Sequence, residues 1–259
     1  MKRFLGAAAI VLSVLCSTAT AQSALDDVMK NKVLRVGIPT DFPPYGFVNT
    51  DLKPQGLDVD MGTYIGDKLG VKTELVAVSS ANRIPYLQTK KVDIVISTLG
   101  KNAEREKVID FAAAYSPFYQ AVFSSKKVAI KNAADLAGKS IGVTRGAIED
   151  MELTKIAPNG TDIKRFEDNN ATVSAFVSGQ TQVVATGASV AGNMMAKNPT
   201  LDAEYKFTLK DSPNFIGVGK GEDALKAKVN AIVAAAKTAG DLDKMAMKWL
   251  GRPAGELPN

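Results

Sequence analysis

The chain has 259 residues, of which 46% are hydrophobic, and it carries a formal net charge of +5. It contains no histidine, which excludes Ser-His-Asp and Cys-His catalysis and histidine-ligated zinc. Basic residues are scattered along the chain, a distribution typical of a solvated surface rather than of a nucleic-acid-binding face. The composition therefore predicts a globular protein. On the whole sequence we expect no metal, no cofactor, no catalytic residue and no nucleic-acid partner.

The first residues predict export from the cell. A positive start, Met1 to Arg3, is followed by an apolar run that ends near Leu15 and is too short to span a bilayer. The run leads into Ala-Thr-Ala at 19–21, a small-residue cleavage site. We predict that residues 1–21 are a cleaved signal peptide and that the mature chain begins at Gln22 in the periplasm. Cys16, the only cysteine, would leave with the signal, so the exported chain would have no disulfide.

After this segment, patterns typical of strands and helices alternate. The expected strands are residues 33–38, 73–78, 92–96, 140–143, 183–185 and 215–218. The expected helices are residues 57–69, 84–88, 171–178, 223–237 and 242–250, with a further short helix ending at 135–139. Residues 41–46, with two prolines and a glycine, are expected to form a loop. This order predicts βαβ units and parallel sheets.

The chain is long enough for two α/β lobes. We expect residues 22–122 plus 216–259 to form lobe 1 and residues 123–215 to form lobe 2. The chain would cross between the lobes near 121–124 and return near 214–217. Two short extended crossings would make a hinge that bends without becoming a flexible linker.

Four blocks of sequence resemble one known family. Residues 56–69, GLDVDMGTYIGDKL, resemble the signature of the family 3 solute-binding proteins of bacterial ABC importers. Three further blocks agree in order: VGIPTDFPPYGF at 36–47, VDIVISTLGKNAEREKVIDF at 92–111 and DLAGKSIGVTRG at 135–146. The resemblance implies a type II periplasmic binding protein with two parallel-rich lobes and two hinge strands. It also implies a monomer that closes on a small polar carboxylate ligand, such as glutamate, aspartate or glutamine, and delivers it to a membrane permease.

The strand ends predict a site for a carboxylate. Ser97, Thr98 and Gly100 directly follow an expected buried strand, and ligands of open α/β sheets bind outside the carboxyl ends of strands. Arg105 begins the next helix, and a guanidinium can hold a carboxylate with two parallel hydrogen bonds. The resemblance implies that Arg105 binds the ligand's α-carboxylate. The alternative is a surface arginine paired with a neighbouring glutamate.

Further ligand contacts follow from the resemblance. Arg83 lies in SSANRIPYL at 79–87, which resembles the members that bind acidic amino acids or their amides, and would face the cleft. The alternative is a solvent-exposed arginine at a helix end. Phe42 aligns with an aromatic that stacks on the ligand, although it could instead pack within its lobe. The expected site also includes Ser80, Thr144, Ile148, Asn169 and Thr186.

Two positions depart from the family pattern. Gly187 stands where an aspartate usually accepts the ligand's α-ammonium, and Ile148 replaces the usual threonine of the second-lobe loop. Three carboxylates or two hydroxyls could hold the ammonium instead: Glu149, Asp150, Asp168, Thr186 and Ser189. Otherwise the ligand is a carboxylate without an ammonium. A secreted dehydratase of a cyclic carboxylate, with Glu149 or Asp150 as general acid, is the enzyme alternative. Without histidine, affinity is expected to vary little between about pH 6 and 8.

Overall fold

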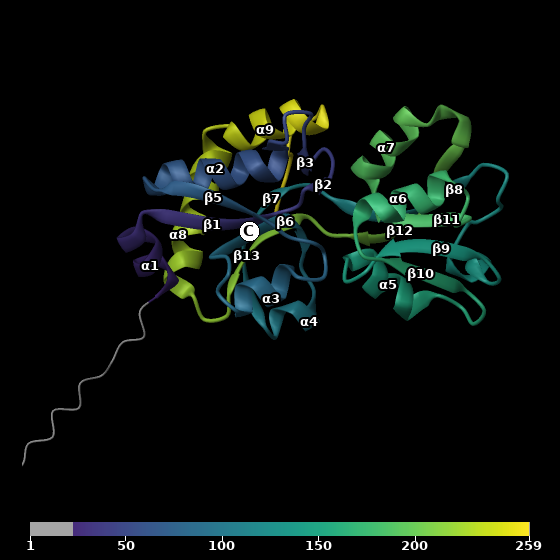
Figure 1. Cartoon of the computed structure of the whole chain (residues 1–259), viewed down its shortest axis with the longest axis horizontal. Helices are drawn as coiled ribbons and strands as arrows, with labels where there is room; N and C mark the ends of the chain where they lie inside the picture. The colour runs from purple at the N-terminus through teal and green to yellow at the C-terminus, as the bar shows by residue number, and fades with distance from the viewer. Residues whose placement is uncertain (1–22, 259) are drawn as a thin grey trace, which may run out of the picture.

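The computed structural model describes residues 23–258, in which two α/β lobes lie side by side (Figure 1). Each lobe is built around its own five-stranded sheet, which confirms the predicted fold class. The predicted signal peptide and the predicted start at Gln22 lie outside the described residues. Within residues 23–258, no helix combines the length and the hydropathy needed to cross a membrane.

The sheet of lobe 1 has the strand order β5-β1-β6-β13-β7. Its strands are β1 (Val33–Ile38), β5 (Lys72–Ala77), β6 (Ile94–Gly100), β7 (Ile109–Ser116) and β13 (Asn214–Gly219). β1 runs parallel to β5 and β6, and β13 runs antiparallel to β6 and β7. A small additional sheet consists of β2 (Asp41–Phe42), β3 (Gly46–Val48) and β4 (Pro54–Gln55).

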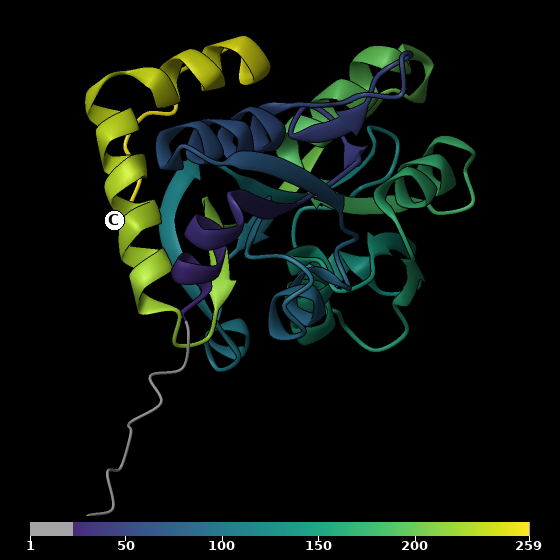
Figure 2. The same cartoon turned by 60° about the vertical axis from the view of Figure 1, so that its left-hand side comes forward.

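Six helices cover this first sheet in the part of the chain that the structure describes. They are α1 (Ala24–Asn31), α2 (Leu57–Leu69), α3 (Arg83–Gln88), α4 (Ala103–Glu106), α8 (Asp223–Thr238) and α9 (Asp241–Leu250). Helix α8 lies on the outer side of lobe 1, and α9 packs against α8 and α2 (Figures 1 and 2). The apolar stripe of α2 is buried at Leu57, Met61 and Ile65, and the helix ends at Gly70, which has φ of 69°. The predicted 57–69 helix is therefore confirmed.

The sheet of lobe 2 has the strand order β10-β9-β11-β8-β12. Its strands are β8 (Tyr119–Ser125), β9 (Ser140–Thr144), β10 (Asp162–Phe166), β11 (Val183–Gly187) and β12 (Ala203–Asp211). Strand β9 is parallel to β10 and β11, whereas β8 is antiparallel to β11 and β12. The surrounding helices are α5 (Ile148–Ile156), α6 (Asn169–Val177), α7 (Ala188–Lys197) and the 3₁₀ turns η1 (Ala133–Leu136) and η2 (Pro199–Leu201).

The chain passes between the sheets at 117–118 and again at 212–213. The Ser212 N–H donates to the Phe118 carbonyl oxygen at 3.1 Å, so the two crossings are tied together. The predicted first crossing at 121–124, and with it the predicted lobe boundary at residue 122, falls inside β8. The predicted return at 214–217 falls inside β13. Both predictions lie too far along the chain because an apolar strand pattern does not reveal which sheet the strand joins.

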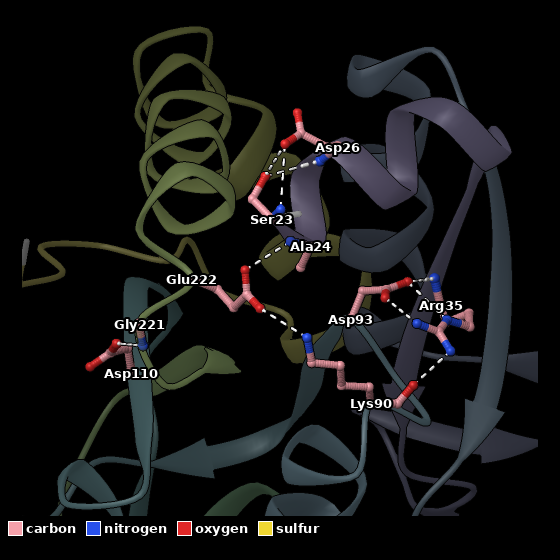
Figure 3. Close-up of polar contacts among 9 residues, drawn as sticks. All are labelled: Ser23, Ala24, Asp26, Arg35, Lys90, Asp93, Asp110, Gly221 and Glu222. Atoms are coloured by element: carbon pink, nitrogen blue, oxygen red, sulfur yellow. Dashed lines mark hydrogen bonds and ion pairs between the residues drawn. The ribbon is translucent and has the colours of Figure 1, made fainter. Parts of the chain in front are cut away.

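A polar network holds α1 against the end of lobe 1 that is remote from lobe 2 (Figures 1 and 3). Ser23 and Asp26 form a reciprocal capping box that starts the helix. The Ala24 N–H donates to a Glu222 carboxylate oxygen at 2.8 Å, and Lys90 Nζ lies 3.7 Å from the other oxygen. The acids and bases gathered here bind one another and fix the helix to the β13–α8 turn.

Candidate ligand-binding site between the lobes

A small cavity lies between the lobes beside the two crossings. Lobe 1 and the first crossing contribute Phe42, Ser80, Arg83, Thr98 and Phe118 to its lining. Lobe 2 contributes Gln120, Ala147, Ile148, Glu149 and Asn169. The structure therefore brings six of the expected ligand-binding residues together: Phe42, Ser80, Arg83, Thr98, Ile148 and Asn169.

The other five expected residues lie outside this lining, in contact with it or next to it. The Ser97 carbonyl accepts from Arg83, and the Gly100 carbonyl accepts from Arg105. Thr144 Oγ1 donates to the Asn169 side-chain oxygen at 2.9 Å and so holds a lining residue from behind. The remaining expected residue, Thr186, is buried in β11 directly before position 187.

The two lobes touch each other across the site. Asp41 Oδ2 of lobe 1 accepts from the Asn169 backbone N–H at 2.7 Å and from its Nδ2 at 3.0 Å. Arg105 Nη2 of lobe 1 donates to the Gly146 carbonyl of lobe 2 at 3.0 Å. These contacts join the two lobes beside the cavity.

The carboxyl end of β6, residues 97–100, has a strained backbone. Thr98 has φ of 43°, in the left-handed region that a β-branched residue rarely adopts. Its N–H donates to Asp58 Oδ2 at 3.0 Å, and Asp58 Oδ1 accepts from the Tyr115 hydroxyl at 2.7 Å. Such strain costs about 1–3 kcal/mol and persists where the surrounding structure imposes it. Asp58, fully buried in the first turn of α2, therefore holds the carboxyl end of β6 in shape.

Arg83 fixes the same end of β6 from the cavity side. It is 3% exposed, and its Nη1 donates to the carbonyls of Ser97 and Thr98. Its Nε donates to the Ser80 carbonyl at 3.3 Å. Burial lowers the pKa of Arg83, against the opposing effect of nearby acids, of which Glu149 is the strongest. The alternative of a solvent-exposed arginine is therefore wrong.

Arg105 is buried behind the carboxyl end of β6, with 2% of its surface exposed. Nη1 donates to the Gly100 carbonyl at 2.7 Å and Nη2 to Gly146, while Nε is buried without a hydrogen-bond partner among the described residues. Burial, followed by the neighbouring charge of Arg83, lowers the pKa of Arg105 to about 9, and Glu149 partly opposes this effect. The alternative of a surface ion pair is wrong, because the adjacent glutamates pair with lysines.

Glu149 brings a carboxylate to the cavity from the first turn of α5. Burial raises its pKa, although Arg83 and Arg105 pull in the other direction. Asp150 instead pairs with Arg165 at 2.7 Å, and Asp168 caps α6. Of the three acids considered for the ligand's ammonium, Glu149 is therefore the one that lines the cavity.

The glycine at position 187 has a steric reason. A Cβ placed there would lie 2.2 Å from Cζ of Phe118, so the phenyl ring fills the space that a side chain would need. Phe118 is held by Tyr45, with ring centroids 5.2 Å apart in a T-shaped contact, and by Phe42 at 6.3 Å. In this packing, an aspartate at 187 does not fit.

Comparison with known proteins identifies the family. The profile of the bacterial extracellular solute-binding proteins, family 3, matches residues 34–252. The chain belongs to this family. The resemblance drawn from residues 56–69 and the three further blocks is thereby confirmed.

Three similar proteins illustrate the range of this family 3 protein's relatives. The ABC transporter glutamine-binding protein GlnH of Bacillus subtilis (strain 168) is 28% identical over 246 residues, covering 93% of this chain and 89% of that protein. An ancestral arginine-binding protein bound to glutamine is 34% identical with a TM-score of 0.80, covering 85% of this chain and 99% of that one. The ancestral amino acid-binding protein AncCDT-1, a precursor of cyclohexadienyl dehydratase, is 31% identical with a TM-score of 0.80. The match covers 88% of this chain and 99% of that one.

Sequence reasoning missed three lining residues of this family 3 protein, Phe118, Gln120 and Ala147. One signal was present for Gln120, since it is a polar residue at the start of a strand that continues with apolar residues. No comparable signal marked Phe118, because an aromatic after a proline fits packing equally well. Within residues 23–258, no group of three His, Cys, Asp or Glu side chains could hold a metal ion.

The stability of the folded protein depends on pH through Asp58, although the chain contains no histidine. The expectation that ligand affinity varies little between about pH 6 and 8 stays a prediction. Burial raises the pKa of Asp58 to about 7, although hydrogen bonds from Tyr115 and Thr98 lower it. The folded protein therefore holds this proton between about pH 4 and pH 7, where the unfolded chain has lost it. The corresponding stability is complete at low pH and is lost as pH rises through 7.

We predict that Asp58→Asn removes this pH dependence. Relative to the variant, wild-type free energy of unfolding should fall by about 4 kcal/mol between pH 4 and pH 7, at about 1.4 kcal/mol per unit of pKa. Urea titrations of both proteins across this range measure the difference. Asp110→Asn is the control of opposite sign, because the hydrogen bond from Lys220 lowers the pKa of Asp110. Parallel curves for wild type and Asp58→Asn would contradict the assignment.

Proposed function

We propose that this family 3 protein is the periplasmic binding subunit of an ABC importer. It captures a polar amino acid, of the glutamate, aspartate or glutamine kind, between its lobes and delivers it to a membrane permease. It acts as a monomer and carries out no reaction. The proposal is supported by relatives named as glutamine-binding and arginine-binding proteins.

The observation that carries the proposal is the pair of buried arginines. Arg83 and Arg105 are almost fully buried, and Glu149 is the acid that opposes the effect of burial on Arg105. Within residues 23–258, the Nε of Arg105 has no hydrogen-bond partner. A buried charge without a partner is costly, and an anionic group from a ligand removes that cost. The site is therefore suited to a carboxylate held by guanidinium groups.

The other site residues take supporting roles in the proposal. Ser80, Thr98 and Asn169 supply polar groups around the ligand, and Phe42 supplies an apolar face. Ser97, Gly100, Thr144 and Thr186 support the residues that line the cavity. Ile148 packs against Gly100, since a Cβ at residue 100 would lie 2.8 Å from Cγ1 of Ile148. This packing shapes the cavity on the side of lobe 2.

A ligand that co-purifies with the protein gives the direct test. The protein is purified from periplasm and denatured, and the released small molecule is identified by mass spectrometry. A polar amino acid is expected. The refolded, ligand-free protein is then screened by thermal unfolding against the amino acids, where a ligand at 100 times its Kd adds ~2.7 kcal/mol of stability. Release of a carboxylate without an amino group, and no stabilisation by any amino acid, would overturn the proposal.

An enzyme is the second candidate, and Glu149 is the observation that favours it. This buried carboxylate has a raised pKa and faces a cavity that also contains Arg83, as a general acid would. Asp150, the other acid considered for this role, is engaged by Arg165. Incubation with a panel of cyclic carboxylates, followed by mass spectrometry for loss of water, tests this candidate. Turnover that disappears in Glu149→Gln would replace the binding function by a dehydratase.

A further inference from the structure

We propose that Gln120 and Glu149 together accept the ammonium group of the ligand, in place of an aspartate at position 187. This inference rests on the proposed function, because it requires an amino acid in the cavity. It assigns the side chain of Gln120, together with the carboxylate of Glu149, as the feature that distinguishes an amino acid from a plain carboxylate.

The first step is that residue 187, at the end of β11, has no room for a side chain that could accept from the ligand. The ring of Phe118 occupies the space beside Gly187, and Tyr45 and Phe42 hold that ring in place. A side-chain acceptor at residue 187 therefore does not fit. The hydroxyl of Ser189 nearby is in a hydrogen bond with the Tyr45 hydroxyl at 3.3 Å.

The second step is that Gln120 stands directly across from this position. Gln120 on β8 and Gly187 on β11 are register partners in the antiparallel pair. Gln120 lines the cavity and is 1% exposed, and its Oε1 has no hydrogen-bond partner among the described residues. A buried carbonyl oxygen without a donor is unfavourable, so an N–H group of the ligand would satisfy it.

The third step is the negative charge of Glu149. This residue lies in α5 of lobe 2, whereas the two arginines belong to lobe 1. Glu149 is the acid that opposes the effect of burial most strongly at Arg83, and it also opposes it at Arg105. Once a ligand carboxylate binds the arginines, positive and negative groups alternate in the order arginine, ligand carboxylate, ligand ammonium and Glu149. Gln120 then adds a neutral acceptor to the same ammonium.

Two other nearby acids already accept hydrogen bonds, which leaves fewer candidates for the acceptor of the ligand's ammonium. Asp41 accepts hydrogen bonds from the Asn169 backbone N–H and from its side chain, and so it holds the lobes together. Asp58 already accepts hydrogen bonds from the Thr98 N–H and the Tyr115 hydroxyl, and it is not among the residues that line the cavity. Among the side chains that line the cavity, Gln120 has a buried Oε1 without a hydrogen-bond partner in the described part of the chain, and Glu149 carries the carboxylate.

The experiment compares amino acids with the same molecules lacking the amino group. Calorimetry measures Kd of wild type and Gln120→Leu for L-glutamine, L-glutamate and L-aspartate, and for glutaramate, glutarate and succinate. Gln120→Leu should bind the amino acids roughly 10- to 100-fold more weakly and the des-amino compounds within about threefold of wild type. Glu149→Gln should show the same selective loss. Gln182→Leu is the matched control, since Gln182 bonds to Ser140 away from the cavity.

Each contrary outcome points to one failure. Equal binding of amino acids by Gln120→Leu and wild type, or an equal loss for both classes of compound, would overturn the inference while the carboxylate site stands. Wild type that binds the des-amino compounds as tightly as the amino acids would also overturn it. If wild type binds none of the three amino acids, the ligand class of the proposed function fails, and this inference fails with it. Circular dichroism and melting curves establish that each variant is folded.

Discussion

Replacement of Arg105 by alanine is expected to weaken binding of an amino acid by roughly 30- to 4,000-fold. Removal of one partner from a buried charge pair costs ~2–5 kcal/mol, and each tenfold change in Kd corresponds to about 1.4 kcal/mol. Arg105 also donates to the Gly146 carbonyl of the other lobe, so the variant loses a contact between the lobes as well. Isothermal titration calorimetry measures the affinity, and a melting curve shows that the fold persists.

Arg145 provides the matched control for this experiment. It lies in the same lobe 2 loop as Gly146, but its side chain is 49% exposed and pairs with Glu167. Arg145→Ala is therefore expected to bind within about threefold of wild type, because exposed ion pairs contribute ~0–1 kcal/mol. Arg105→Lys separates charge from geometry, since an ammonium keeps the charge but lacks the guanidinium fork. Binding by Arg105→Ala within threefold of wild type would show that the carboxylate lies elsewhere.

The second large effect is expected from Gly187→Asp, which restores the aspartate usual in the family. The new Cβ would overlap the Phe118 ring, whose Cζ lies 2.2 Å away. Overpacking of this kind costs about 1–3 kcal/mol, and placing a carboxylate against three aromatic rings adds to that cost. For a chain of this size, each kilocalorie lowers the melting temperature by roughly 2–4 °C. Differential scanning calorimetry measures the loss.

Two further variants locate the cause of this loss. Gly192→Asp in α7 is the control, because a Cβ there meets nothing within 4 Å, and its melting temperature should change little. The double variant Phe118→Ala with Gly187→Asp should be more stable than the sum of the single losses predicts, since the smaller residue makes room. A Gly187→Asp protein with the same melting temperature as wild type would show that the Phe118 ring moves aside freely.

Local patterns in the sequence determined much of the fold. The stripe of α2, the strand β1 and the helices α8 and α9 were all predicted, because apolar periodicity depends only on residues close together in the chain. The half-buried strands β10 and β12 were not predicted, since few of their residues are strongly apolar or strictly alternating. The motif blocks placed both arginines in the expected site, and the cavity lies beside them.

Only the tertiary structure decided which side chains meet in the cavity. Phe118 closes the position at Gly187, and Gln120 stands across from it, because β8 pairs with β11 over a long separation in the chain. The sequence offered Glu149 and Asp150 equally, and the packing of α5 turned the first to the cavity and the second to Arg165. Burial likewise raised the pKa of Asp58, behind the carboxyl end of β6, to about 7, although the composition contained no histidine. Burial and pairing between distant strands are properties of the folded chain, and no local pattern encodes them.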